Sequence, residues 1–423
     1  MKVLDITGNP FSLYLNNGKT HEAIFSAFNK EELCQIYVRP VATNLIDFVY
    51  CSSYYCVSDW DVLNRLTFKS NKCGSVIKNA NQIKADDSFH YTNGNVTSIG
   101  SKKGFAGVLR DLLWGTGLWK NQDLKSWLKA QKPDVIFIDG GGDSYMYNIA
   151  LYISQYLNIP LVYYVTDDYV IYPKHKSIIQ KIHHHFVFKK ISEVISKSEY
   201  CYAIGEVMAN EYSQYFRKTF GYVMNAINVL PYKPQTGTRK KIVISYFGSL
   251  GLNRDRIIAS LGSMASKLFE INVYAFNIND ESKRLLEENG VKYKGALKSE
   301  ELDDAMYASD VLLHVESDDE ESRAFTKLAI STKIPEYLMH SRLILGYGPT
   351  EVASMQLISN NNIGVVISSD DTKDEQMRKL EMILDSDNRS HIAERGYQFA
   401  LENFDRKKIG MVIKEKFTEI LKK

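Results

Sequence analysis

The length, composition and charge of the chain exclude several classes of protein. Its 423 residues predict two or three domains, at roughly 150 residues per domain. With 44% hydrophobic and 24% charged residues the composition is that of a globular protein, which excludes disorder, collagen and a coiled coil. Lys and Arg total 52 and Asp and Glu total 50, so the net charge is +2, far from the strongly basic balance of a dedicated nucleic-acid binder.

The distribution of apolar residues and cysteines predicts a cytoplasmic protein. No run reaches the roughly 18 consecutive apolar residues that a membrane-spanning helix needs. Asp5 stands where a signal peptide needs its apolar stretch. The five cysteines include no C-x-x-C motif, so we expect reduced thiols, without a disulfide framework or a thiolate metal site.

Short β-rich runs alternate with longer helical patterns from the start of the chain, which predicts α/β domains built on parallel sheets. Most of these runs are apolar on both faces, as a sheet covered by helices on both sides requires. In the front half we predict strands at Val3–Thr7, Leu33–Val38, Asp134–Asp139, Leu161–Thr166 and Glu199–Ile204.

A polar stretch beginning at Pro231 interrupts this pattern, and its two prolines and one glycine predict a linker. We therefore expect an N-terminal domain at 1–230, a linker at 231–240, a second domain at 241–404, and a C-terminal helix at 405–423 that can cross back to the first domain. The fold class is then two tandem doubly wound, Rossmann-like domains, whose strand ends face a shared cleft. In the second domain we predict strands at Ile242–Phe247, Ile271–Phe276, Val311–Val315, Leu343–Leu345 and Ile363–Ile367.

The most informative stretch for function is the predicted helix start around Thr332, Lys333, Ile334 and Glu336. A helix N-terminus that carries a lysine directs backbone N–H groups and a cation at whatever lies before it, which favours a phosphate. A carboxylate one turn into the helix can accept hydrogen bonds from the hydroxyls of a ribose. On spacing alone, a helix cap with a surface Lys–Glu pair explains the same residues equally well.

The order of several motifs resembles that of family-4-type GT-B glycosyltransferases, the retaining enzymes of bacterial capsule and exopolysaccharide assembly. The resemblance spans most of the chain, and the order of the motifs is more specific than any one of them. The motifs are KPDVI at 132–136, IPLV at 159–162, NAI at 225–227, YFGSL at 246–250, KIPEYL at 333–338, LIL at 343–345 followed by Pro349, and NIGVV at 362–366.

The resemblance implies the reaction and its donor site. It implies a metal-independent, retaining transfer of a sugar from a UDP- or GDP-type donor, with no cofactor, to a lipid-linked oligosaccharide or similar glycan. Glu336 resembles the second glutamate of the family's E-x7-E motif, which binds the nucleotide ribose. The implied donor-binding residues are Gly248, Ser249, Arg254 or Arg256, Thr332, Lys333, Ile334 and Glu336.

One departure from the family concerns the first glutamate of that motif, because Leu328 stands eight positions before Glu336. That glutamate normally addresses the donor sugar. Glu316, Glu320 or Glu321 can substitute for it, and we take Glu316 as the candidate. For most of this acidic stretch a solvated loop is the alternative.

The front domain offers candidates for the acceptor site. Asp167 and Asp168 follow a predicted strand where many family members carry His-Asp near the reacting centre. A carboxylate there can orient or deprotonate an acceptor hydroxyl, although one of the two can instead cap the next helix. Gly8 with Asn9, and Gly141 with Asp143, belong to predicted glycine-rich loops of the acceptor cleft.

The sequence also allows other functions. Gly142-Asp143-Ser144 resembles the nucleophile turn of some serine esterases, so a hydrolase on the same frame is an alternative, as is a nucleotide-sugar epimerase. The missing first glutamate allows a non-catalytic nucleotide-sugar-binding partner. Three consecutive histidines at 183–185 cannot all face one metal from a regular helix, and the D-x-D at 59–61 belongs to a different glycosyltransferase fold, so we expect no metal site.

A lysine-rich segment suggests contact with a membrane surface. Lys174 to Lys197 holds six lysines and one acid, with apolar residues at helical spacing. Such a helix can lie on the anionic inner leaflet, although a helix packed on a sheet shows the same apolar stripe. Three aromatic residues in 105–119 (Phe105, Trp114 and Trp119), with Lys102 and Lys103 beside them, support a lipid-facing surface. We therefore expect peripheral attachment at the inner face of the plasma membrane.

Overall fold

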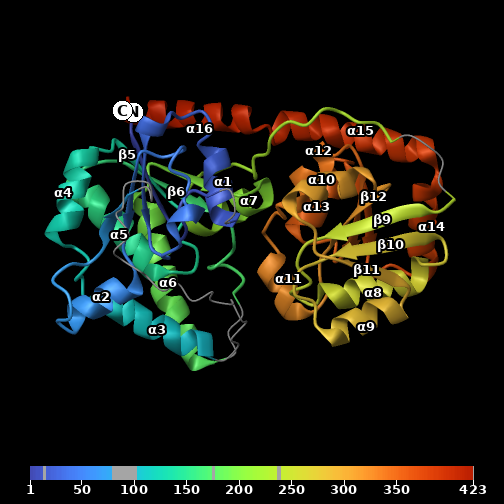
Figure 1. Ribbon diagram of the computed structural model, residues 1–423, viewed down its shortest axis with the longest axis horizontal. Coiled ribbons are helices and arrows are strands. Elements are labelled where there is room, and N and C mark those ends of the chain that lie inside the picture. Colours follow the sequence, from blue (N-terminus) through green and yellow to red (C-terminus); the bar gives the residue numbers. More distant parts are fainter. Residues whose placement is uncertain (13–15, 79–101, 174–176, 236–239, 423) are drawn as a thin grey trace. The chain divides into compact units, whose positions relative to one another are not determined.

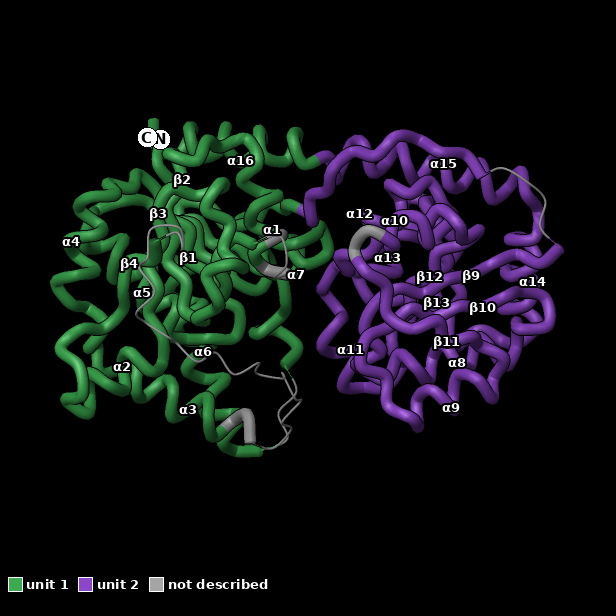
Figure 2. The backbone as a smooth tube through the Cα atoms, viewed as in Figure 1, with its two compact units in different colours: residues 1–223, 406–423 green, residues 224–405 purple. Residues whose placement is uncertain are grey.

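The computed structural model describes residues 1–12, 16–78, 102–173, 177–235 and 240–422. The chain forms two compact units: Met1–Val223 together with Arg406–Lys423, and Met224–Asp405 (Figure 2). Each unit is an α/β domain on one largely parallel sheet, so the predicted fold class of two doubly wound domains is confirmed. Along the chain, the first unit ends at Val223 and the second begins at Met224, whereas the predicted domain boundary was at 230/231.

The sheet of the first unit has the strand order β4-β3-β2-β1-β5-β6-β7-β8. All neighbouring pairs are parallel except β3 and β4. The strands are β1 (Val3–Thr7), β2 (Leu33–Tyr37), β3 (Ser53–Cys56), β4 (Ser75–Ile77), β5 (Val135–Ile138), β6 (Leu161–Val165), β7 (Tyr200–Ala203) and β8 (Phe220–Tyr222). The helices are α1 (Asn16–Ile24), α2 (Asp59–Leu66), α3 (Lys102–Gly115), α4 (Gln122–Gln131), α5 (Ser144–Leu157), α6 (Ile178–Lys197), α7 (Glu206–Phe216) and α16 (Arg406–Leu421).

The sheet of the second unit is entirely parallel, with the order β11-β10-β9-β12-β13-β14. Its strands are β9 (Ile242–Phe247), β10 (Phe269–Tyr274), β11 (Val291–Gly295), β12 (Val311–Val315), β13 (Leu343–Gly348) and β14 (Gly364–Ser368). Its helices are α8 (Arg254–Ala265), α9 (Asp280–Glu288), α10 (Ser299–Tyr307), α11 (Glu320–Thr326), α12 (Lys333–Met339), α13 (Ala353–Asn360), α14 (Lys373–Leu384) and α15 (Ser386–Asn403).

Alternation along each strand of the second unit produces two separate cores. Tyr246 and Leu313 face one core with residues of α8, α9 and α14, whereas Phe247 and Leu312 face the other with residues of α10, α12, α13 and α15. In Figure 1, α8 and α9 lie on one side of this sheet, and α12 and α15 lie on the other. Because successive side chains of a strand point to opposite faces, a strand buried on both sides is largely apolar along its whole length. This requirement explains the continuous apolar runs in the sequence.

The sequence predicts a linker at 231–240 and a C-terminal helix that can cross back to the first domain. In the structure, each of these segments belongs to a single unit. Described linker residues are fixed to the second unit, since Arg342 Nη1 donates to the carbonyl of Lys233 at 2.8 Å. The C-terminal helix α16 packs against α1 in the first unit. Arg406 there forms an ion pair with Glu22 at 2.8 Å.

Candidate functional site

The second unit has a topological switch point between β9 and β12. The chain leaves β9 for β10 and β11 on one side of the sheet, and it returns through β12 to build the other side. Ligands of open α/β sheets bind outside the carboxyl ends of the strands at such a point. The residues that follow these two strands, Gly248 and Glu316, therefore mark the candidate donor site.

Gly248 and Lys333 pack against each other at this position. The φ of Gly248 is +126°, and a Cβ there would lie 2.5 Å from Cε of Lys333, so only glycine fits. Lys333 begins α12, and its Nζ donates to the hydroxyl of Tyr246 at 2.9 Å. The Tyr246 hydroxyl in turn donates to the carbonyl of Ser249 at 2.5 Å, which fixes the turn after β9.

Glu316 lies in the same cluster, with a side chain that is almost completely buried. Its carboxylate contacts Arg254 Nη2 at 3.5 Å and His314 Nε2 at 3.3 Å. Burial would raise the pKa of Glu316, but His314 and the cations Arg254 and Lys333 together lower it, so Glu316 is ionised at neutral pH. Burial lowers the pKa of His314, which favours its neutral form.

Lys333 has an unusual protonation equilibrium. Burial, together with the neighbouring charge of Arg254, lowers its pKa to about 7. The lysine is therefore only partly charged at neutral pH, and an anion bound beside it would draw a proton onto it. With Arg254, it places two basic side chains at the switch point.

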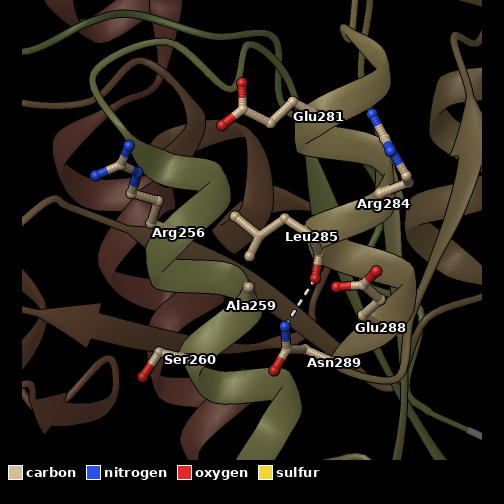
Figure 3. A pocket seen from close by; sticks show the side chains of 8 residues that line it. All are labelled: Arg256, Ala259, Ser260, Glu281, Arg284, Leu285, Glu288 and Asn289. Atoms are coloured by element: carbon tan, nitrogen blue, oxygen red, sulfur yellow. Dashed lines mark hydrogen bonds between the residues drawn. The ribbon is translucent and has the colours of Figure 1, made fainter.

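The structure separates the two arginines that the sequence left as alternatives. Residues two positions apart on a helix point about 200° apart, and Arg254 faces Glu316 whereas Arg256 does not. Arg256 is exposed and lines an open groove between α8 and α9, about 670 Å³ in volume, with Arg284 and Glu288 among its neighbours (Figure 3). Of the two, Arg254 is the residue of the candidate donor site.

The other predicted donor residues occupy different environments. Ile334 is fully buried in a core, and its N–H donates to the carbonyl of Ser331 at 3.2 Å, so it offers a ligand neither side chain nor N–H. Thr332 is exposed at the N-cap of α12, and Glu336 is half-buried in the first turn of that helix. Ser249 is exposed in the turn after β9.

The first unit has its own switch point, between β1 and β5. Asp168, at the neighbouring strand β6, accepts hydrogen bonds from the N–H groups of 170, 171 and 172 at 2.7–2.9 Å and from the Tyr212 hydroxyl at 2.8 Å. Asp168 therefore caps the following loop, the structural role that the sequence left open for one of the pair. Asp167 is half-buried and accepts from the Tyr169 hydroxyl at 3.3 Å. Burial raises its pKa, and so does the charge of Asp139.

The predicted acceptor-cleft residues lie in the loops after β1 and β5. The carbonyl of Gly8 accepts from the N–H of Arg39 at 3.0 Å, and Asn9 follows it, half-buried. Asp143 pairs with Arg39 at 3.0 Å and with Arg110 at 3.5 Å. Gly141, with a φ of +54°, donates to Asp139 at 3.3 Å.

The sequence did not predict a cluster of buried polar side chains beneath the loops that follow β1 and β5. His21, Asp5 and Gln35 are fully buried, and Asp139 is nearly so. The one available signal was Asp5 itself, a charged residue in the centre of an otherwise apolar strand. His314 and Tyr246, both buried in apolar strand sequences of the second unit, were missed in the same way.

The geometry of the esterase-like turn does not favour a hydrolase. Ser144 is buried at the first position of α5, and its hydroxyl donates to the carboxylate of Asp111. His183 contacts the other oxygen of that carboxylate at 2.7 Å. The serine is thus hydrogen bonded to an acid rather than to the imidazole that would activate it.

Within the described ranges, no three His, Cys, Asp or Glu side chains are grouped as a metal would require. The D-x-D motif serves local structure: Asp61 accepts from the N–H of Ser58 at the start of α2, and Asp59 pairs with Arg110 at 2.9 Å.

No protein-family model matches the chain, and no curated protein matches it. Solved structures match it over almost its whole length. Alr3699/HepE of Anabaena, in complex with UDP, has a TM-score of 0.65 at 13% identity and covers 99% of this chain and 100% of its own. Sucrose-phosphate synthase of Thermosynechococcus elongatus has a TM-score of 0.61 at 10% identity, with 99% of each chain covered. WaaG, a glycosyltransferase involved in lipopolysaccharide biosynthesis, has a TM-score of 0.54 at 13% identity and covers 97% of this chain and 99% of its own.

At these identities the likeness establishes the fold. The chain has the two Rossmann-like domains of GT-B glycosyltransferases, as its sequence predicts.

Proposed function

We propose that the chain is a glycosyltransferase that moves a sugar from a nucleotide-diphosphate donor to a glycan acceptor. The observation that carries this proposal is the cluster of Gly248, Arg254, Glu316 and Lys333 at the switch point of the second unit. We propose UDP as the nucleotide, because a structural neighbour binds UDP and UDP-glucose.

The donor cluster supplies electrostatic stabilisation where the reaction needs it. Negative charge develops on the diphosphate as its bond to the sugar breaks, and cations held in place beforehand stabilise that charge without reorganising. Arg254 and Lys333 are such cations, and Glu336 would hold the ribose. Glu316, kept ionised by His314 and Arg254, would then face the donor sugar in place of the absent first glutamate.

The first unit would bind the acceptor, with Asp167 at the reacting hydroxyl. We propose a retaining, metal-independent transfer to a lipid-linked glycan of cell-surface polysaccharide, as the family resemblance implies. Product stereochemistry by NMR tests retention, and full activity in excess EDTA tests metal independence.

An exposed apolar surface on α3 and α6 supports attachment to a membrane. Ile178 and Ile182 at the start of α6 are 76% and 46% exposed, and Phe105 and Leu112 of the adjoining α3 are 58% and 59% exposed. Lys181 lies exposed among them. Because this surface combines exposed apolar side chains with a lysine, we propose that it rests on an anionic leaflet. Among the helices that the structure describes, none has the length and apolarity of a membrane span.

Part of the expected lipid-facing surface was assigned wrongly. Trp114 and Trp119 are buried in the first unit, where Trp114 stacks on Tyr145 with ring centroids 4.3 Å apart. Their side chains are unavailable to lipid. Lys174 and Lys176 lie outside the described residues, as do the side chains of Lys102 and Lys103.

A nucleotide-binding assay tests the proposed function. Thermal unfolding is followed with UDP, GDP, ADP and CMP and with their sugar conjugates. A ligand at a hundred times its Kd stabilises the folded state by about 2.7 kcal/mol. We expect UDP and its conjugates to stabilise the wild type, and Glu336→Gln to lose most of that effect.

Glu381→Gln, an exposed acid on α14 of the same unit, is the matched control and should respond like the wild type. No stabilisation by any nucleotide would contradict the proposal. Conversion of the donor sugar without an acceptor would indicate an epimerase, and binding without turnover under any acceptor condition would indicate a non-catalytic partner.

A further inference from the structure

A buried ionic network lies beneath the switch point of the first unit. His21 on α1 contacts Asp5 of β1 through Nδ1 at 2.9 Å, and Asp139 after β5 through Nε2 at 3.5 Å. Gln35 of β2 donates to the second oxygen of Asp5 at 2.6 Å. Charged groups are rarely placed in such an interior unless they are paired and hydrogen bonded, because desolvation costs several kcal/mol per ion.

The network carries a fixed charge. Burial lowers the pKa of His21, but Asp5 and Asp139 outweigh burial and raise the pKa to about 10. His21 is therefore a cation at neutral pH. One cation between two carboxylates leaves one net negative charge below the edge of the sheet, which disfavours a phosphate there and favours a hydrogen-bond donor such as a sugar hydroxyl.

The loop after β5 connects this network to Asp167. Gly141 donates to Asp139 Oδ1 at 3.3 Å, and a Cβ on the next residue, Gly142, would lie 3.1 Å from the ring of Tyr169. The hydroxyl of Tyr169 donates to Asp167 at 3.3 Å. Asp139 and Asp167 thus follow neighbouring strands, β5 and β6. The glycine loop after Asp139 packs on Tyr169, and Tyr169 is hydrogen bonded to Asp167.

The groups that change the pKa of Asp167 follow both β5 and β6. Burial raises the pKa of Asp167 most, and the charge of Asp139 raises it further, whereas the hydrogen bond from Tyr169 lowers it and Asp168 raises it slightly. The hydroxyl of Thr7, at the end of β1, is also fully buried and has no hydrogen-bond partner among the described residues.

We propose that the His21–Asp139 pair is a positioning device for Asp167, which accepts a hydrogen bond from the reacting hydroxyl of the acceptor. Asp139 places a fixed negative charge beside Asp167, and His21 holds Asp139 in that position. The inference rests on the proposed glycosyl transfer for the identity of the ligand, but the link between Asp139 and Asp167 is a property of the protein alone.

The link is tested without any activity. Protein labelled with ¹³C at the aspartate carboxyl carbons is titrated by NMR, and the Asp167 signal is assigned from its loss in Asp167→Asn. In Asp139→Asn, we expect the titration midpoint of Asp167 to fall, because the neighbouring negative charge that raises it is removed. Asp134→Asn, which removes an exposed carboxylate just before the other end of β5, should leave the midpoint unchanged. A midpoint that stays in place in Asp139→Asn overturns the inference.

The role of Asp167 is tested by measuring kcat/KM for the acceptor as a function of pH. The acidic limb of this profile reports the titration of a group that must be ionised. We expect this limb to move to lower pH in Asp139→Asn by the same amount as the NMR midpoint, with the KM for the donor unchanged. Asp139→Glu keeps the charge, so its limb should stay near that of the wild type. Asp139→Ser also removes the charge, and it replaces Asp139→Asn if that variant fails to fold.

A shifted NMR midpoint with an unshifted limb would overturn the contact between Asp167 and the hydroxyl. Absence of transfer in the wild type would refute the proposed function instead, and the NMR titration would still decide the link.

Discussion

Lys333 makes donor binding depend on pH. Its pKa is about 7 in the free protein, and a bound diphosphate would raise it, so binding takes up a proton. Affinity should then be highest below pH 7 and should fall as the pH rises above that value. Isothermal titration with UDP-glucose, in buffers of different ionisation heat, measures both the affinity and the proton uptake.

Lys333→Met should bind UDP-glucose more weakly and show no proton uptake. Lys292→Met, which removes a surface ion pair with Glu270 in the same unit, is the control and should behave like the wild type. Equal proton uptake in the wild type and Lys333→Met would contradict the assignment.

His21 makes folding stability depend on pH in the alkaline range. Its pKa is raised from 6.5 in the unfolded chain to about 10 in the folded one. A raised pKa means that the stabilisation is fully present below about pH 6.5 and is lost as the pH rises towards about 10. Urea unfolding across this range should show a declining free energy of unfolding in the wild type.

His21→Asn should be less stable at neutral pH and should lack most of that decline. His185→Asn, which changes an exposed histidine of α6, is the matched control. A decline of the same size in His21→Asn would show that other groups cause it.

At the scale of the element, α6 divides into two parts with different partners. Its second half buries Val187, Ile191, Val194 and Ile195 in the first unit, whereas Ile178 and Ile182 in its first half are exposed. The core-helix interpretation is therefore confirmed for the second half, and contact of the first half with a membrane stays a prediction. Periodicity could not distinguish them, because both halves carry the same apolar stripe.

The exposed half of α6 should bind anionic vesicles. Each isoleucine that enters the lipid contributes about 1.5–3 kcal/mol when fully buried, so Ile178→Ser/Ile182→Ser should weaken vesicle binding about tenfold or more. Flotation with phosphatidylglycerol vesicles at low salt measures this. Val412→Ser, at a 54% exposed position on α16, is the control. Wild-type protein that stays unbound would contradict the proposal.

At the scale of the whole molecule, the chain returns to its first unit after completing the second. Phe417 of α16 is fully buried, and its ring lies 6.1 Å from those of Phe28 and Phe137. Phe417→Ala should destabilise the first unit by about 3–5 kcal/mol, while UDP should stabilise the second. Calorimetry should therefore show two transitions, of which the mutation lowers one and the nucleotide raises the other.

Leu421→Ala, at a 38% exposed position of the same helix, should change neither transition appreciably. A single transition that both Phe417→Ala and UDP displace would show that the two units unfold together.

The sequence alone determined the fold class and the bounds of several strands. Strands β9 and β12 have the predicted bounds, because continuous apolar runs between polar flanks leave little ambiguity. Strands β4 and β8, of three residues each, were not predicted, since so short a run shows no periodicity. The helix start at Lys333 was predicted from local sequence, because a helix N-terminus has local signals, whereas the turn at Gly248 was predicted from the family resemblance.

Only the tertiary structure decided which charged side chains act together. It separated Arg254 from Arg256, assigned Asp168 to a cap, and placed Asp139, 118 residues away in sequence, against His21. Such pairings depend on which strand ends the sheet brings side by side, and the order of strands is a long-range property. The pKa of each of these groups then depends on its burial and its charged neighbours, which no local pattern of residues shows.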